Sequence, residues 1–212
     1  MRELRLSPVL DVGCAQGMLG HLVAGHGLTL DGVEANPAWA DMARPYYRDV
    51  WASFVEDAPL PAREYRLVVC GDILEHTPDP VAILRRLRQA ATPDATFIIS
   101  VPNVAHVAVR LMLLAGRFPK MDRGPLDRTH LQFFTKDTAR QMVEAAGLRV
   151  VRTTTTGVPL DEVWKRGEGN LMYRAATRCQ HAALAVAPRL FGFQWLMVCT
   201  AADAEAGANG QH

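Results

Sequence analysis

Short apolar runs alternate with amphipathic stretches along most of this chain. Runs at 9–12, 28–33, 50–55, 65–70, 96–101, 148–153 and 193–200 have the length and composition of buried strands. Apolar positions three or four residues apart predict helices over 17–24, 37–43, 104–116, 136–146 and 170–186, and one that begins at 78–80. The run at 65–70 is apolar throughout, as in a parallel strand covered on both faces. The alternation predicts an α/β fold.

The first predicted strand leads directly into a turn that contains two glycines, Gly13 and Gly17. Glycine permits backbone angles and close approaches that a side chain would forbid, and the following helix offers its positive end to an anionic group. The turn lacks the Gly-Lys-Ser/Thr ending of a P-loop, and Ala15 stands where a dinucleotide fingerprint has its second glycine. The turn is therefore a candidate ligand loop of another kind.

An acid follows the second predicted strand, roughly 20 residues beyond the glycine turn. This acid is Glu34, and Ala35 comes next. In nucleoside-binding α/β folds an acid here accepts hydrogen bonds from two ribose hydroxyls, so Glu34 is the candidate ribose ligand. The alternative is a solvated strand end.

Three chemically active side chains follow the fourth predicted strand: Asp72, Glu75 and His76. A helical turn that starts at Asp72 would project all three from one side, at the edge where open α/β sheets bind ligands. Two carboxylates and an imidazole can hold a divalent cation or present a general base.

Asp11, Gly13 and Gly17 form Asp-x-Gly-x-x-x-Gly, which resembles motif I of the class I S-adenosylmethionine-dependent methyltransferases. The resemblance continues in order through Glu34, the segment 72–76, Ser100-Val101-Pro102-Asn103 and the segment 127–135. It implies a Rossmann-like, seven-stranded, mostly parallel sheet with helices on both faces. The last strand would enter antiparallel between the fifth and sixth.

S-adenosylmethionine would be the methyl donor. In the resembled family an acidic or polar residue after the third strand lies near the adenine; Ser53 and Phe54 occupy that place here, which makes Asp57 the candidate, against a plain surface acid. Cys14 faces the donor by position alone. The implied donor ligands are Asp11, Gly13, Cys14, Gly17, Glu34, Ala35, Asp57 and Asp72.

His76 and His130 are the candidate catalytic residues, because a hydroxyl acceptor needs help to lose its proton. Together with Asp72 and Glu75 they resemble the magnesium or manganese ligands of the small-RNA 3′-terminal 2′-O-methyltransferases, with Asp72 in place of the more usual Glu. Ubiquinone-pathway O-methyltransferases share the Glu-His portion. The alternatives are a metal-free general base and a structural histidine.

The segment 104–134 is the candidate substrate lid. With Lys136 it carries six positive and two negative residues, which suits an acidic or phosphorylated group, although solvated arginines are the alternative. The charged residues are Arg110, Arg117, Lys120, Arg123, Arg128 and Lys136, with Asp122 and Asp127.

The composition limits the remaining possibilities. A net charge of +1 disfavours a nucleic-acid partner, and the four cysteines have no metal-type spacing. No secretion signal or membrane-length apolar run occurs, so we expect a cytoplasmic protein. We expect one domain over 1–202, a disordered tail at 203–212, and a sheet-packing or homodimer face at 170–186. Only eight residues precede the first strand, so either another segment covers the substrate or the N-terminus is incomplete.

The sequence therefore favours O-methylation of a small polar metabolite, such as a sugar, a glycosylated molecule or a natural-product intermediate. The alternatives are metal-dependent 2′-O-methylation of an RNA terminus, N-methylation, and a non-enzymatic regulatory subunit that binds the nucleoside.

Overall fold

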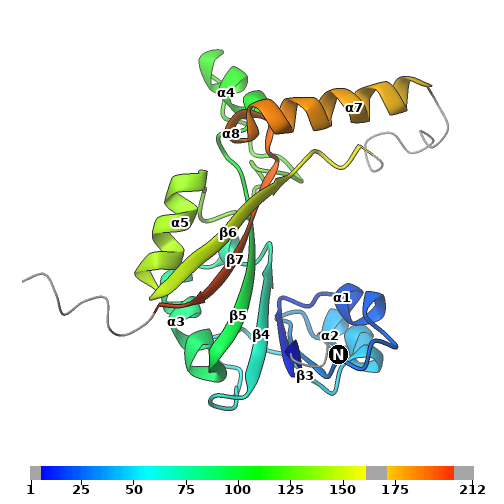
Figure 1. Ribbon diagram of the computed structural model, residues 1–212, viewed down its shortest axis with the longest axis vertical. Helices are drawn as coiled ribbons and strands as arrows, with labels where there is room; N and C mark the ends of the chain where they lie inside the picture. Colours follow the sequence, from blue (N-terminus) through cyan, green and yellow to red (C-terminus); the bar gives the residue numbers. More distant parts are fainter. Residues whose placement is uncertain (1–5, 161–170, 203–212) are drawn as a thin grey trace, which may run out of the picture.

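A computed structural model describes residues 6–160 and 171–202 as a seven-stranded sheet with the order β3-β2-β1-β4-β5-β7-β6 (Figure 1). Strands β1 to β5 pair in parallel, whereas β7 is antiparallel to both β5 and β6. This confirms the predicted fold class. The strands are β1 (Val9–Val12), β2 (Leu30–Val33), β3 (Asp49–Trp51), β4 (Tyr65–Gly71), β5 (Ala91–Pro102), β6 (Leu148–Thr156) and β7 (Gln194–Ala201).

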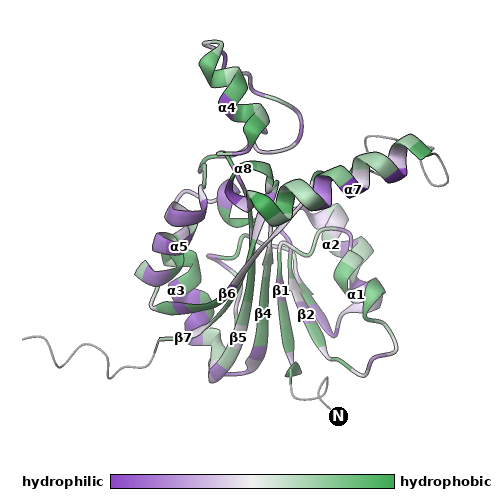
Figure 2. Cartoon of the chain, turned by 45° about the horizontal axis from the view of Figure 1, so that its top comes forward, coloured by the Kyte–Doolittle hydropathy of each residue, from purple (hydrophilic) through white to green (hydrophobic). Residues whose placement is uncertain are grey.

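Helices cover both faces of the sheet, and two apolar clusters fill the space between. Ile83, Leu84 and Leu87 of α3 join Val143 of α5 in the larger cluster, whereas Ala40 of α2 belongs to the smaller one. Figure 2 shows the central strands as mostly hydrophobic. The helices are α1 (Met18–Leu22), α2 (Pro37–Ala43), α3 (Pro80–Ala90), α4 (Val107–Leu114), α5 (Lys136–Ala145), α7 (Leu171–Val186) and α8 (Pro188–Phe191), with 3-10 turns η2 (Arg44–Tyr46) and η3 (Leu74–His76).

The third strand is shorter than the predicted 50–55. It ends at Trp51, and the backbone N–H groups of Asp57 and Ala58 both donate to the carbonyl of Phe54, at 3.1 Å each. These bonds close a turn soon after the strand ends. Residues of this turn line a cavity together with residues at the ends of β1 and β2.

The predicted helical turn at Asp72 also begins later. Asp72 has a φ of 52°, in the left-handed region, and the 3-10 turn starts only at Leu74. Asp72 therefore lies outside the helical turn and does not project from one side together with Glu75 and His76.

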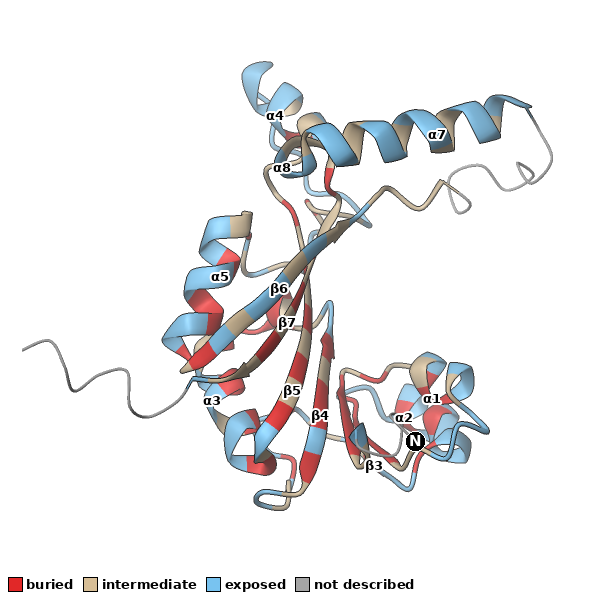
Figure 3. Ribbon diagram, viewed as in Figure 1, coloured by how far each residue is buried: buried red, intermediate tan, exposed pale blue. Residues whose placement is uncertain are grey.

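Helices α4 and α7 lie at the top of the molecule and are mostly exposed (Figure 3). Helix α4 buries only Val109, and α7 buries none of its residues, so α7 does not pack on the sheet as one alternative expected. Its role as a dimer face stays a prediction. Asn170 and the predicted tail 203–212 lie outside the described residues. In the described part of the chain, no helix is long and apolar enough to cross a membrane.

Candidate active site

The glycine turn is tied to the end of the neighbouring strand β2. The carbonyl of Val33 accepts from the backbone N–H of Gly13 at 2.8 Å and of Cys14 at 3.1 Å. Gly17 has a φ of 86°, and a Cβ there would lie 2.9 Å from Cα of Ala43. Glycine is therefore required at this position by both its backbone angle and its closeness to α2.

The side chain of Glu34 forms a hydrogen bond with the same turn. Its Oε2 accepts from the backbone N–H of Ala15 at 2.9 Å, and its Oε1 accepts from that of Asn36 at 2.8 Å. The residue is only 8% exposed. Each carboxylate oxygen has a further lone pair, so Glu34 can shape the loop and still accept a ligand hydroxyl.

A cavity of 240 Å³ opens beside this turn, at the carboxyl ends of β1 and β2. Two of the candidate donor ligands, Glu34 and Ala35, line this cavity. Asp57 does not line it, and Glu56 of the turn at 54–58 lies there instead. Ser53 and Phe54 lay within the predicted strand 50–55, and only Glu56 lay just beyond it, so the early end of β3 at Trp51 is what brings them to the cavity. The lining is Val12, Gly13, Val33, Glu34, Ala35, Ser53, Phe54, Val55, Glu56, Ile73, His76, Thr77 and Pro78.

Asp11 and Cys14 are buried and do not line this cavity. Asp11 is 6% exposed and accepts from the hydroxyl of Tyr47 at 2.6 Å, while that hydroxyl accepts from the N–H of Gly20. Burial raises the pKa of Asp11 to about 6. The thiol of Cys14 is packed against Gly32 in the smaller apolar cluster, so the side chain does not face the cavity as its position had indicated.

Asp72 lies at the ends of three strands. Its Oδ1 accepts from the hydroxyl of Ser100 at 2.8 Å, and its Oδ2 accepts from Nε2 of Gln194 at 2.5 Å. Asp72 does not line the 240 Å³ cavity. Gln194 was missed by the sequence reasoning, because it lies 122 residues away and reaches this point only through the antiparallel insertion of β7.

Glu75 is the most unusual carboxyl group of the site. It is 1% exposed, and neither of its carboxylate oxygens has a hydrogen-bond partner among the described residues. Burial, with the charge of Asp72 as a smaller cause, raises its pKa to about 8. Its backbone carbonyl accepts from the N–H groups of Leu131 and Gln132 at 2.8 and 3.0 Å, which brings the 127–135 segment against η3.

The two candidate histidines meet at this junction. The rings of His76 and His130 lie 4.8 Å apart edge to face, and Nε2 of His130 is 4.0 Å from Oε1 of Glu75. Burial and the neighbouring His76 lower the pKa of His130, so its imidazole is neutral at pH 7. One ligand atom from each of Glu75, His76 and His130 lies within 4.8 Å of the others, and Asp72 is not part of this group.

A second cavity, of 480 Å³, lies between α4, the following loop and the ends of β6 and β7. Its wall is largely apolar and includes Pro125 and Leu126, a few residues before His130. It is formed by His106, Ala108, Val109, Met112, Met121, Arg123, Gly124, Pro125, Leu126, Val158, Pro159 and Phe193.

Comparison with known proteins decides the family. A family model described as "Methyltransferase domain" matches residues 2–153, which include the glycine turn, Glu34, Glu75, His76 and His130. The chain belongs to this methyltransferase family. It is a class I S-adenosylmethionine-dependent methyltransferase.

Two curated relatives are similar over most of this methyltransferase. The chain is 29% identical to the ubiquinone biosynthesis O-methyltransferase of Aeromonas salmonicida, over 76% of the chain and 71% of that protein. It is 25% identical to the Coxiella burnetii protein of the same name, over 69% of the chain and 65% of that protein.

Solved structures share the fold. A SAM-dependent methyltransferase from Archaeoglobus fulgidus has a TM-score of 0.62 at 17% identity, covering 92% of this chain and 88% of that one. The 1,6-didemethyltoxoflavin-N1-methyltransferase of Burkholderia thailandensis, with its substrate and S-adenosylhomocysteine bound, has a TM-score of 0.59 at 18% identity, covering 92% and 71%.

Proposed function

We propose that this methyltransferase binds its donor in the Glu34 cavity and methylates a hydroxyl of a small-molecule acceptor at the His76–His130 pair. One observation carries the proposal. His76 lines the Glu34 cavity, and its ring also contacts His130, which lies against the backbone of Pro125 in the wall of the second cavity. The pair thus stands between the Glu34 cavity and a separate space for an acceptor.

For methyl transfer to a hydroxyl, the protein has to position the two reactants and accept the proton of the hydroxyl. The sulfonium of the donor makes its methyl group electrophilic, so the site has to align the acceptor and exclude water. His130 is buried with its pKa lowered, which suits a neutral base that accepts the hydroxyl proton. The aligned hydroxyl oxygen then forms the new bond to the methyl carbon as the carbon–sulfur bond breaks.

The second cavity supports an acceptor with an apolar body. Its walls come chiefly from the 104–134 segment that was expected to be a substrate lid. Among the acceptors expected from the sequence, a natural-product intermediate with a hydrocarbon or ring portion fits these walls better than an unmodified sugar. An RNA terminus is disfavoured, because a net charge of +1 provides few phosphate contacts.

Calorimetric titration with S-adenosylhomocysteine tests the donor site. We expect Glu34→Ala to weaken binding by about tenfold or more, a loss of at least roughly 1.4 kcal/mol, because it removes the ribose ligand and loosens the Ala15 turn. Asp57→Ala is the matched control, since Asp57 is an exposed acid outside the cavity, and should bind as the wild type does. Equal affinity in all three proteins would contradict the proposal.

As an alternative to the base role of His130, we propose that Glu75, His76 and His130 hold a divalent cation, magnesium or manganese. The residues fit such an ion: the carboxylate oxygens of Glu75 are buried and have no hydrogen-bond partner among the described residues, and Nε2 of His130 lies 4.0 Å from Oε1 of Glu75. Two imidazoles suit manganese better than magnesium, which prefers oxygen ligands. When bound, the ion would polarise a hydroxyl that coordinates it and lower the pKa of that hydroxyl.

Direct titration with Mn²⁺ tests this metal site without any turnover. The wild type should show one saturable binding event, and His130→Ala should lose it, because each ligand removed lowers affinity by about tenfold or more. His181→Ala, a change at an exposed histidine of α7, should bind manganese normally. Failure of the wild type to bind, or unchanged binding by His130→Ala, would rule out this set of ligands.

A further inference from the structure

A third cavity, of 150 Å³, lies where α4, α5, α8 and the start of β7 meet. It shares no lining residue with the two cavities described above. At the roughly 30 Å³ that a water molecule occupies in the liquid, it has room for about five waters, enough for a single oxyanion group but not for a nucleoside. Its lining residues are Asn103, Ala105, Arg110, Thr135, Lys136, Asp137, Arg189 and Trp195.

The charge balance of this third cavity is positive. Arg189 forms a bidentate ion pair with Asp137, with N–O distances of 2.9 and 3.0 Å, so the charges of these two side chains offset each other. Arg110 and Lys136 remain as the surplus. Nε of Arg110 donates to the carbonyl of Ala105 at 2.6 Å, which fixes the guanidinium at the cavity.

Trp195 forms a buried part of the same wall, because its side chain is only 2% exposed. Nζ of Lys136 lies over the Trp195 ring, 5.8 Å from its centre, so this cation is held close to the indole.

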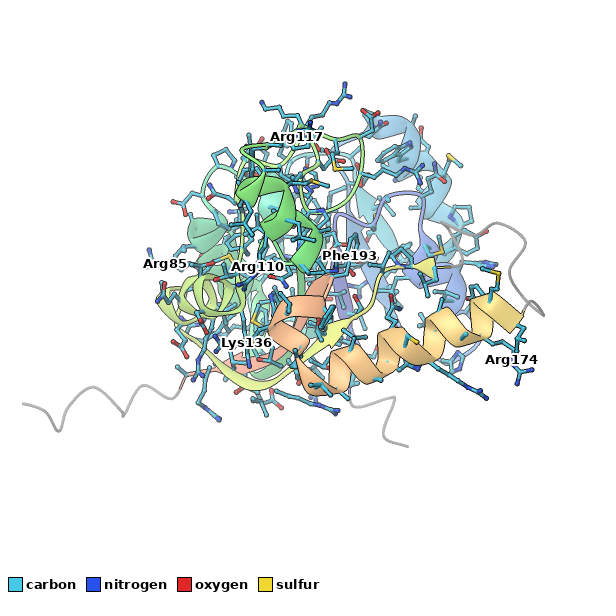
Figure 4. All side chains as sticks on the ribbon, turned by 90° about the horizontal axis from the view of Figure 1, so that it is seen from above. Arg85, Arg110, Arg117, Lys136, Arg174 and Phe193 are labelled. Carbon is cyan, nitrogen blue, oxygen red and sulfur yellow. The ribbon has the colours of Figure 1, made fainter. Side chains whose placement is uncertain are left out.

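The beginning of α5 forms another part of the wall. This ten-residue helix is capped by Thr135, whose hydroxyl accepts from the N–H of Thr138. The N-terminal end of α5 therefore lies at the cavity, at Lys136 and Asp137. The N–H groups in the first turn of a helix have no acceptor within the helix, and they make this end positive. Arg110 of α4 and Lys136 of α5 both line this cavity, whereas Arg117, labelled with them in Figure 4, does not.

We infer that this cavity is a binding site for a small oxyanion, with phosphate chemistry, held by Arg110 and Lys136 beside the ring of Trp195. An oxyanion offers acceptor oxygens and negative charge to both cations at once. The phosphate could be a free ion or an ester group on a larger ligand. The inference does not rest on the proposed function, because phosphate binding needs neither donor nor acceptor.

Nuclear magnetic resonance of the ¹⁵N-tryptophan-labelled protein tests the site. The chain has four tryptophans, and the Trp195→Phe variant assigns the Trp195 indole signal. Addition of inorganic phosphate at constant ionic strength, with chloride as the balancing ion, should shift that signal saturably with a Kd below about 10 mM. Arg110→Gln and Lys136→Gln should each raise that Kd by about fivefold or more. Arg117→Gln, a matched change at an exposed arginine outside the cavity, should leave it unchanged.

Phenyl phosphate distinguishes the two sources. If it binds about tenfold tighter than inorganic phosphate, the site takes an ester group; equal or weaker binding identifies the free ion. The inference is overturned if the Trp195 signal does not move, if chloride moves it equally, or if both cavity variants bind phosphate as the wild type does. A protein that binds phosphate here but never binds S-adenosylhomocysteine would refute the proposed function and leave this inference standing.

Discussion

At the scale of single residues, Asp11 gives the sharpest prediction of pH dependence. Its pKa rises from 3.8 to about 6 on folding, because burial disfavours the carboxylate. Below pH 4 the carboxyl is protonated in both states. Between pH 4 and 6 the unfolded chain ionises more readily than the folded one, so this group destabilises the fold as pH rises.

Replacing Asp11 by Asn removes that penalty. The free energy of unfolding of Asp11→Asn, relative to wild type, should increase by about 2 to 3 kcal/mol between pH 4 and 6 and then level off. Urea unfolding across this range measures it, with Asp57→Asn as the exposed control. A difference that does not change with pH would show that Asp11 titrates alike in both states.

Residue identities were predictable where a fixed local geometry demands them. Gly13, Gly17 and Glu34 could be proposed from spacing along the chain, since a glycine turn and an acid one strand away recur together in nucleoside sites. Their role in donor binding stays a prediction. Asp57 and the thiol of Cys14 do not line the 240 Å³ cavity, because the orientation of each side chain depends on a turn or a packing neighbour that no local pattern encodes.

At the scale of helices and strands, hydrophobic periodicity located every strand of the sheet. Caps were equally informative: Asn36 accepts from the first N–H groups of α2, and Thr135 forms a capping box with Thr138. The differences lie at the ends of elements. Strand β3 stops early and is followed by the local hydrogen bonds of the 54–58 turn, and Asp72, which is bonded to Ser100 and Gln194, lies outside η3. Periodicity does not encode such bonds, and the ends of elements depend on them.

Both histidines could be named as candidates from the sequence, but their contact depends on long-range hydrogen bonds that the sequence does not reveal. His76 and His130 are 54 positions apart, and they meet because the carbonyl of Glu75 accepts from the N–H groups of Leu131 and Gln132. These bonds join a loop to a 3-10 turn, and no periodic pattern in the sequence marks such a contact. The third cavity was hidden for the same reason, since Trp195 reads in sequence as an ordinary strand residue.

At the scale of the whole molecule, the strand order concentrates the chemistry at one edge. Strands β1 and β4 are adjacent, so the glycine turn after one and the 72–76 segment after the other open toward the same cavity. The antiparallel β7 then brings Gln194 to Asp72 and Trp195 to the third cavity. The three cavities thus all lie where the ends of the strands meet the helices and loops.

A crystal structure of the complex with S-adenosylhomocysteine tests the central claim most directly. The account predicts density in the 240 Å³ cavity, with both ribose hydroxyls at the carboxylate of Glu34 and the adenine among Ser53, Phe54 and Glu56. The sulfur should point toward His76. Density for the nucleoside at any other place, or its ribose out of reach of Glu34, would contradict the account.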